Sequence, residues 1–337
     1  MIFFFLILIL LFISNIHFKK FDRDYLNINN TTIINGLFVV IVFFSHFISY
    51  NHGFNKIDLY FVKFIGKIGQ LMVTTFLFYS GYGIFYKIHK NKKEYIDSFF
   101  KKRFLKLLFN FDLAVLLFYA LSLIMNNKYS FLNVLLSLIG WESLGNSNWY
   151  IFVIFIMYIA IMFVFKLFKK QSNLFCLIAI SLISVAYVFI LNIFKDDFWC
   201  NTLLCFPAGM WYSYYKEQID NIIFKKISNY FITLTSLIII FILLFFINDN
   251  IFIYNIFSII FVLIITLLLP IVSSTNKIIL YFGKNVFWIY ILQRIPMIIF
   301  QGKINIYLYF IICFFITIVL SYILSFITNK MYKRFNF

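Results

Sequence analysis

Two residues inside long apolar stretches are the ones most able to do chemistry in this sequence. His46 lies within IVFFSHFISY (41–50), and Arg294 lies in another apolar run that begins near residue 279. An ionisable side chain inside a membrane helix is costly unless it lines a cavity or has a partner. A neutral imidazole can remove the proton of a hydroxyl group, and a guanidinium can stabilise a developing oxyanion. The alternative for each is a purely structural contact, which for Arg294 includes a pairing with Asp112.

The helix that contains His46 is expected to place Asn35 on the same face, because eleven residues make almost three turns. At 1.5 Å per residue, His46 is expected about 20 Å above the cytoplasmic end of its helix. Arg294 is expected at about the same height, and Asp112 at a lower one. We therefore predict a polar site deep in the membrane, formed by His46 and Arg294.

A second group of candidates could bind an anion. The segment 87–106 contains eight Lys and Arg residues, and Lys102, Arg103 and Lys106 are spaced to share one helix face. An arginine on a helix often binds phosphate groups, because its guanidinium donates two parallel hydrogen bonds. A Lys-rich segment that only anchors the chain in the membrane is the commoner alternative. We predict a phosphate site at these three residues.

A third group lies in GWESLGNSNWYIF (140–152), which is expected at the opposite membrane surface. Aromatic rings beside amide and carboxylate groups suit a sugar-binding rim, although Trp and Tyr are common at membrane interfaces in any case. The predicted members of this rim are Glu142, Asn148, Trp149 and Tyr150. No metal site is predicted, because the four cysteines form no CxxC pair and no cluster with histidine.

The elements that must position these residues are transmembrane helices. Hydrophobic residues make up 64% of the chain, charged residues 12%, and the mean hydropathy is +0.96, whereas about a quarter of the residues of soluble domains are charged. Long apolar runs recur instead of the short alternating segments of a membrane β-barrel. We predict an all-α integral membrane protein, a polytopic bundle of about 10–11 transmembrane helices. The expected spans are 2–18, 33–50, 68–86, 107–125, 149–168, 173–194, 200–215, 229–247, 251–271, 279–300 and 306–328.

The chain is expected to have two parts and no soluble domain. Residues 1–32 are predicted to form an N-terminal transmembrane helix and a basic linker, and residues 33–337 the transmembrane domain with the candidate sites. Of the Lys and Arg residues, 22 lie in one set of alternate loops, six in the other set and one inside a span. The positive-inside rule then places the amino terminus outside and the carboxyl terminus in the cytoplasm of a cell-membrane protein. The net charge of +17 needs no nucleic acid to explain it, and attraction to anionic membrane lipid would add to the bias.

Five segments occur in the order that is typical of one protein family. They are IINGLFVVIVFFSHF, FLFYSGYGIFY followed by KKRFLKLL, NSNWYIFVIFIMYI, LCFPAGMWYSYYKE and YFGKNVFWIYILQRIPMI. Through them most of the chain resembles the acyltransferase-3 family of bacterial integral-membrane acyltransferases. The essential histidine of that family maps onto His46. Asn35 stands where the family has a basic residue, Lys106 stands where it has the second arginine of Arg-x-x-Arg, and Gln293 stands where it has a late histidine.

The resemblance implies a membrane-bound O-acyltransferase that moves an acetyl or other acyl group from cytoplasmic acyl-coenzyme A to an extracytoplasmic glycan. The acceptor would be a hydroxyl of a cell-surface polysaccharide, peptidoglycan or a lipid-linked sugar. Acetyl-coenzyme A would be a donor substrate and not a permanently bound cofactor. His46 would be the general base or a transient acyl carrier, with Arg294 beside it. The phosphates would bind at Arg103, Lys106 and Lys102, and the acceptor near Glu142, Asn148, Trp149 and Tyr150.

Two other functions compete with acyl transfer. A transporter or flippase of lipid-linked sugars would also suit many spans and polar residues inside the membrane. Against it, the two halves of the sequence show no clear repeat and no matching pair of helices broken by Gly or Pro. A catalytically inactive partner of a glycan-synthesis complex is the other alternative, because Asn35 and Gln293 depart from the family pattern.

Overall fold

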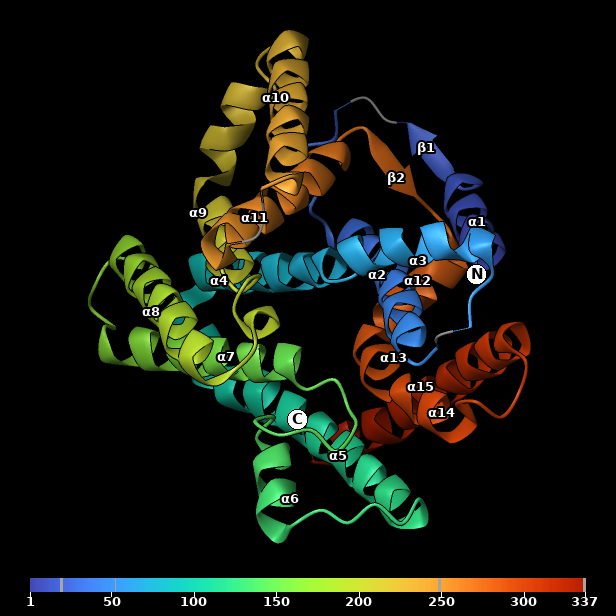
Figure 1. Cartoon of the computed structure of the whole chain (residues 1–337). Coiled ribbons are helices and arrows are strands. Elements are labelled where there is room, and N and C mark those ends of the chain that lie inside the picture. Colours follow the sequence, from blue (N-terminus) through green and yellow to red (C-terminus); the bar gives the residue numbers. More distant parts are fainter. Residues whose placement is uncertain (19–20, 52, 248–249, 336–337) are drawn as a thin grey trace.

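The computed structural model describes residues 1–18, 21–51, 53–247 and 250–335, and these are almost entirely helical (Figure 1). Within them the strands are β1 (Ile16–Phe18) and β2 (Val272–Ser274), which pair antiparallel. The helices are α1 (Ile2–Ile13), α2 (Ile28–Ser49), α3 (Lys56–Ile68), α4 (Leu71–Phe99), the π-helix η1 (Phe100–Leu105), α5 (Lys106–Ile124), α6 (Phe131–Leu138), α7 (Trp149–Leu167), α8 (Asn173–Phe194), the short 3₁₀-helix η2 (Asp197–Trp199), α9 (Cys205–Ile223), α10 (Ile227–Phe245), α11 (Ile251–Leu268), α12 (Lys277–Lys284), α13 (Val286–Leu292), α14 (Arg294–Phe300) and α15 (Ile306–Phe335).

The prediction of an all-α polytopic membrane protein is confirmed. In the described part of the chain, 7 helical segments are long and apolar enough to cross a membrane, and one of them, Lys56–Ile124, contains both α4 and α5. Large apolar side chains such as Phe163, Phe189 and Phe315 are exposed on the outer surface. Exposed apolar surface on this scale marks a surface that contacts lipid.

Several predicted spans differ from the observed helices. The expected helix 2–18 is shorter, because α1 ends at Ile13 and the chain continues into β1. The expected span 279–300 is divided into α12, α13 and α14. At each of its two breaks a side-chain amide donates to a helix carbonyl: Asn285 Nδ2 donates to Tyr281 O at 3.0 Å, and Gln293 Nε2 donates to Tyr290 O at 2.8 Å.

Two pairs of glycines allow helices in the centre of the bundle to approach closely. A Cβ at Gly81 of α4 would lie 2.1 Å from Phe206 O, and a Cβ at Gly209 of α9 would lie 2.0 Å from Phe78 O. Gly36 of α2 and Gly283 of α12 make the same kind of approach. Small residues let membrane helices pack backbone to backbone, so these pairs fix α4 on α9 and α2 on α12.

Side-chain contacts join the loops into two groups, and each group contains only loops predicted to lie on one side of the membrane. In the predicted cytoplasmic group, Lys216 Nζ donates to Arg23 O at 3.0 Å and Lys92 Nζ donates to Lys169 O at 3.3 Å. In the predicted outer group, Gln70 Nε2 donates to Phe198 O at 3.1 Å. The loop pairing agrees with the alternation of spans inferred from the positive charges.

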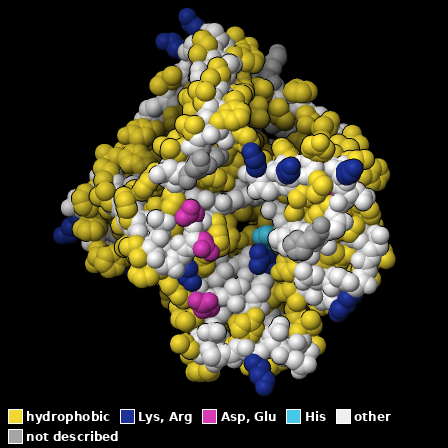
Figure 2. All heavy atoms as spheres, viewed as in Figure 1, with side chains coloured by type: hydrophobic (Ala, Val, Ile, Leu, Met, Phe, Trp, Pro, Cys, Tyr) yellow, Lys and Arg dark blue, Asp and Glu magenta, His cyan; other side chains and the backbone are white. Residues whose placement is uncertain are grey.

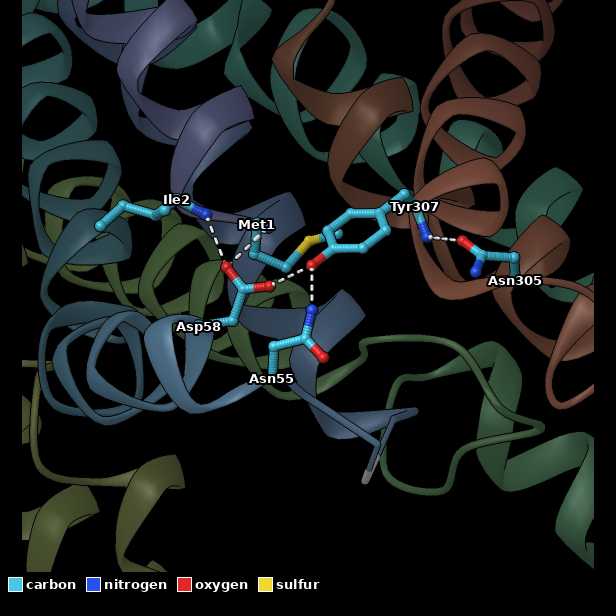
Figure 3. Close-up of polar contacts among 6 residues, drawn as sticks. All are labelled: Met1, Ile2, Asn55, Asp58, Asn305 and Tyr307. Carbon is cyan, nitrogen blue, oxygen red and sulfur yellow. Dashed lines mark hydrogen bonds and ion pairs between the residues drawn. The ribbon is translucent and has the colours of Figure 1, made fainter.

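Asp58 of α3 ties α1 and α15 together at the predicted outer end (Figure 3). Its Oδ1 accepts from the Met1 ammonium at 2.8 Å and from the Ile2 N–H at 3.1 Å, and its Oδ2 accepts from the Tyr307 hydroxyl at 2.9 Å. Asn55 Nδ2 donates to the same hydroxyl at 2.9 Å. The buried carboxylate therefore holds the short helix α1 against the rest of the bundle.

Candidate functional site

His46 lies in the last turn of α2, next to a tyrosine of α13. The centroid of its ring is 6.0 Å from that of Tyr290, and the two planes meet at 52°. Its Nδ1 is buried and has no hydrogen-bond partner among the described residues. A buried polar atom normally has a partner, so this nitrogen is free to accept a proton or a hydrogen bond from a bound molecule.

Arg294 lies at the first position of α14, directly after the helix break at Gln293. It is close enough to His46, Tyr50 and Tyr290 for its charge to act on all three side chains. Within the described residues it forms no ion pair with Asp112 or another carboxylate, and its Nε is buried without a partner. The sequence predicted His46 and Arg294 at one height, and the structure brings them together.

The surface is hollowed near the ends of these helices. Figure 2 shows a hollow between α7 and α13, with a histidine and a basic side chain at its edge and acidic side chains on its other side. A site open on this face could admit a molecule from one side of the membrane.

Three further cavities share one lining residue, Arg103. The basic cavity, of about 550 Å³, is lined by Lys87, Lys90, Lys102, Arg103 and Lys106 together with Glu94. The tyrosine cavity, of about 810 Å³, is lined by Tyr79, Tyr82, Tyr86, Asp24, Asn29, Lys87 and Arg103 among others. The deep cavity, of about 410 Å³, extends from Arg103 past Asn35 to Tyr150 and Tyr290. The linings of the three cavities thus share Arg103 and together include both the basic segment and Tyr290, the neighbour of His46.

The π-helix η1 positions Arg103 at this junction. Its i→i+5 hydrogen bonds widen the turn, and π turns within α-helices occur frequently at functional sites. Tyr95 and Tyr158 lie close to the guanidinium. Lys106, in contrast, has its Nζ 4.0 Å from the centroid of the Tyr332 ring. The predicted phosphate-binding residues Lys102, Arg103 and Lys106 all line the basic cavity, and only Arg103 among them reaches the other two.

The predicted sugar rim consists of loops that are firmly connected to each other. Lys195 pairs with Glu142 at 3.5 Å and donates to Trp141 O at 2.9 Å. Asn148 is buried, and its Nδ2 donates to Gly140 O at 2.8 Å and to Glu142 O at 2.9 Å. The nitrogen of Asn148 therefore holds the loop 140–148, while the Glu142 side chain stays half-exposed.

Trp149 and Tyr150 point to different places, whereas the sequence grouped them on one rim. The ring of Trp149 contacts that of Phe198 at 6.2 Å, in the neighbouring loop. Tyr150 faces the deep cavity, where its ring lies 5.5 Å from that of Tyr290 and 6.1 Å from that of Phe76. The structure therefore groups Tyr150 with the interior and leaves Trp149 at the surface.

Sequence analysis did not single out Tyr290 or Ser147 as site residues. Tyr290 is 2% exposed and Ser147 is 3% exposed, and their buried hydroxyls lie close to each other, although neither forms a hydrogen bond of good geometry in the described structure. A buried tyrosine usually finds a partner for its hydroxyl. The available signal was a hydroxyl inside or beside an apolar span, but the sequence contains many of these.

Comparison with known families gives one match. A family model described as an acyltransferase domain, Acyl_transf_3, matches residues 28–326. These residues include α2, the linings of the basic and deep cavities, and both His46 and Arg294, whereas Asp24, Leu26 and Asn27 of the tyrosine cavity precede the matched range. No curated protein and no solved structure matches the chain.

Proposed function

Since this chain belongs to the acyltransferase-3 family of membrane acyltransferases, we propose that it moves an acetyl or related acyl group from cytoplasmic acyl-coenzyme A to a hydroxyl of an extracytoplasmic cell-surface glycan. The observation that carries this proposal is the series of cavities that meet at Arg103 and end at Tyr290, whose ring centroid is 6.0 Å from that of His46. Such a series suits a donor with an anionic head and a long arm.

The donor binds with its phosphates near Arg103. Coenzyme A is strongly anionic, and five cationic side chains line the basic cavity against one carboxylate, that of Glu94. The pantetheine arm then follows the deep cavity, which is lined mainly by apolar and tyrosine side chains, and brings the thioester to Tyr290. The volumes of these cavities are typical of small-molecule sites.

His46 and Arg294 carry out the transfer. His46 takes the proton of the acceptor hydroxyl as the hydroxyl oxygen attacks the thioester carbonyl carbon. The carbonyl oxygen becomes an oxyanion, which the guanidinium of Arg294 stabilises. The carbon–sulfur bond then breaks, and the imidazolium returns the proton to the leaving thiolate. The products are the acylated glycan and free coenzyme A, with no other reactant.

The acceptor approaches from the hollow on the face seen in Figure 2. Trp149 and the half-exposed Glu142 offer a ring and a hydrogen-bond acceptor to a sugar at this end of the bundle. A lipid-linked or polymeric glycan would be held here while one of its hydroxyl groups reaches His46.

Transfer of a labelled acetyl group tests the proposal. Purified protein in lipid vesicles is given labelled acetyl-coenzyme A and a mixture of cell-envelope glycans, and the glycans are then separated and counted. Label in the glycan fraction that is lost in His46→Gln supports the proposal. Movement of a lipid-linked sugar across the vesicle membrane without acetylation would overturn it and favour a flippase. Neither transfer nor movement, with well-folded protein, would favour an inactive partner.

A further inference from the structure

The tyrosine cavity differs in chemistry from the basic cavity beside it. On α4, the rings of Tyr82 and Tyr86 are inclined at only 12°, with their centroids 6.2 Å apart, and form an aromatic wall. Asp24, from the segment that leads into α2, and Asn29, in the first turn of α2, are exposed and line the same cavity. Gly83 lies on the α4 wall as well, and a Cβ there would meet no atom within 4 Å.

We propose that the tyrosine cavity is the subsite for the purine base of the donor nucleotide. This inference rests on the proposed function, because it assigns one part of acyl-coenzyme A to one cavity. Purine bases stack on tyrosine rings. The edge of adenine presents an amino donor and ring-nitrogen acceptors, which match a carboxylate at Asp24 and an amide at Asn29.

Charge divides the donor between the two cavities. Lys87 and Arg103 line both of them, so a phosphate group bound at these two cations lies at the boundary. The carboxylate of Asp24 disfavours a second phosphate further into the tyrosine cavity but accepts a hydrogen bond from an amino group. The base therefore occupies the tyrosine cavity, the phosphates lie at Lys87 and Arg103, and the arm leaves through the deep cavity.

The wall opposite the tyrosines is held in place by a buried network. The Tyr25 hydroxyl donates to Asp220 Oδ1 at 2.8 Å and lies 2.7 Å from the Tyr212 hydroxyl. Lys216, which pairs with Asp220, also donates to Arg23 O at 3.0 Å. The segment that carries Asp24 is thus fixed before any ligand binds, and a preformed site loses less conformational freedom on binding.

Two donors that differ only in the nucleotide test the proposal. Tyr86 is 44% exposed, so its replacement should leave the fold intact. For Tyr86→Leu we expect KM for acetyl-coenzyme A to rise about tenfold, the loss expected for one stacked base, with kcat little changed. KM for acetyl-pantetheine, which has no nucleotide, should not change. Tyr86→Phe should behave like the wild type, because the ring and not the hydroxyl makes the contact.

Nucleotide binding gives a measurement that does not depend on acyl transfer. Adenosine 3′,5′-bisphosphate should raise the melting temperature of the wild type and of Tyr86→Phe, and much less that of Tyr86→Leu and Gly83→Leu. Gly66→Leu is the matched control, because Gly66 of α3 is also a helical glycine with open space and lines none of the three cavities.

The outcomes separate this proposal from the proposed function. Nucleotide binding that depends on Tyr86, in a protein that transfers no acetyl group, would leave the subsite standing and reject the reaction. Acetyl transfer with equal KM and equal nucleotide affinity in the wild type, Tyr86→Leu and Gly83→Leu would reject the subsite and leave the reaction standing.

Discussion

The unpartnered Nδ1 of His46 determines how substitutions at this residue should behave. His46→Gln and His46→Ala should each lower kcat by about 10²–10⁴, the usual contribution of a general base. Their melting temperatures should stay close to that of the wild type, because no hydrogen bond from Nδ1 to the protein is lost. Activity of the wild type should also fall at acid pH, as the imidazole becomes protonated and can no longer accept a proton. An active His46→Gln would rule out the catalytic role.

Arg103 and Lys106 should differ in their effect on the donor, although both belong to the predicted phosphate site. Arg103 lines all three cavities, whereas Lys106 lies against the ring of Tyr332. We expect Arg103→Ala to raise KM for acetyl-coenzyme A by at least about tenfold, as for a lost charge-assisted hydrogen bond, and Lys106→Ala to raise it less. Arg103→Lys should restore only part of the affinity, because lysine lacks the planar fork. Equal KM values in the wild type and in the double variant Arg103→Ala, Lys106→Ala would mean that both residues only anchor the topology of the chain and do not bind the donor.

At the scale of elements, two glycines of one helix should respond in opposite ways to the same substitution. Gly81→Ala forces α4 away from α9, because the new Cβ would lie 2.1 Å from Phe206 O. We expect a loss of about 1–3 kcal/mol, as in other overpacked cores, seen as a lower melting temperature in detergent. Gly83→Ala should be neutral or stabilising by up to about 1 kcal/mol, because its Cβ meets nothing and alanine favours helix. Equal melting temperatures for the two variants would contradict the close helix contact.

The same scale shows what the sequence predicts well and what it does not. The expected span 173–194 has the same bounds as α8, because Ser172 caps its start and the polar Lys195 follows its end. The helices α3 and α6 were not predicted, because they contain 13 and 8 residues and no long apolar run. The breaks at Asn285 and Gln293 were missed too, because hydropathy does not report where a side-chain amide donates to a helix carbonyl.

The site was predictable only in part, for a related reason. The depths of His46 and Arg294 in the membrane follow from residue counts along the chain, so their common height could be inferred, whereas their contact depends on which helices pack together. The different ring partners of Trp149 and Tyr150 could not be inferred, because both residues are aromatic and adjacent in sequence. The cavities depend on side chains from α2, α4, α7 and α13, and a single sequence does not say which helices are neighbours.

At the scale of the whole molecule, the two groups of loops predict which ends of the helices face the cytoplasm. A cysteine at Lys128, in the predicted outer loop, should react in intact cells with a membrane-impermeant thiol reagent. A cysteine at Lys93 should react with the reagent only after the membrane has been permeabilised. The four native cysteines are buried, and burial together with the nearby Asp197 carboxylate raises the pKa of Cys200 to about 11, so the background should be low. Labelling of the cysteine at Lys93 but not of that at Lys128 in intact cells would show that the topology is the reverse of the predicted one.

The edge-to-face contact of Tyr150 and Tyr290 also matters for the membrane as a barrier. The deep cavity reaches these rings, and a hollow with a histidine at its edge opens on the face in Figure 2. A continuous water-filled passage between the cavities and the hollow would let protons cross the membrane and dissipate the proton gradient. With the rings in place, the proposed reaction needs only the exchange of the thioester bond for an ester bond at this point. Under the proposed function, the acyl group would change sides at these rings while the nucleotide stays on the cytoplasmic side.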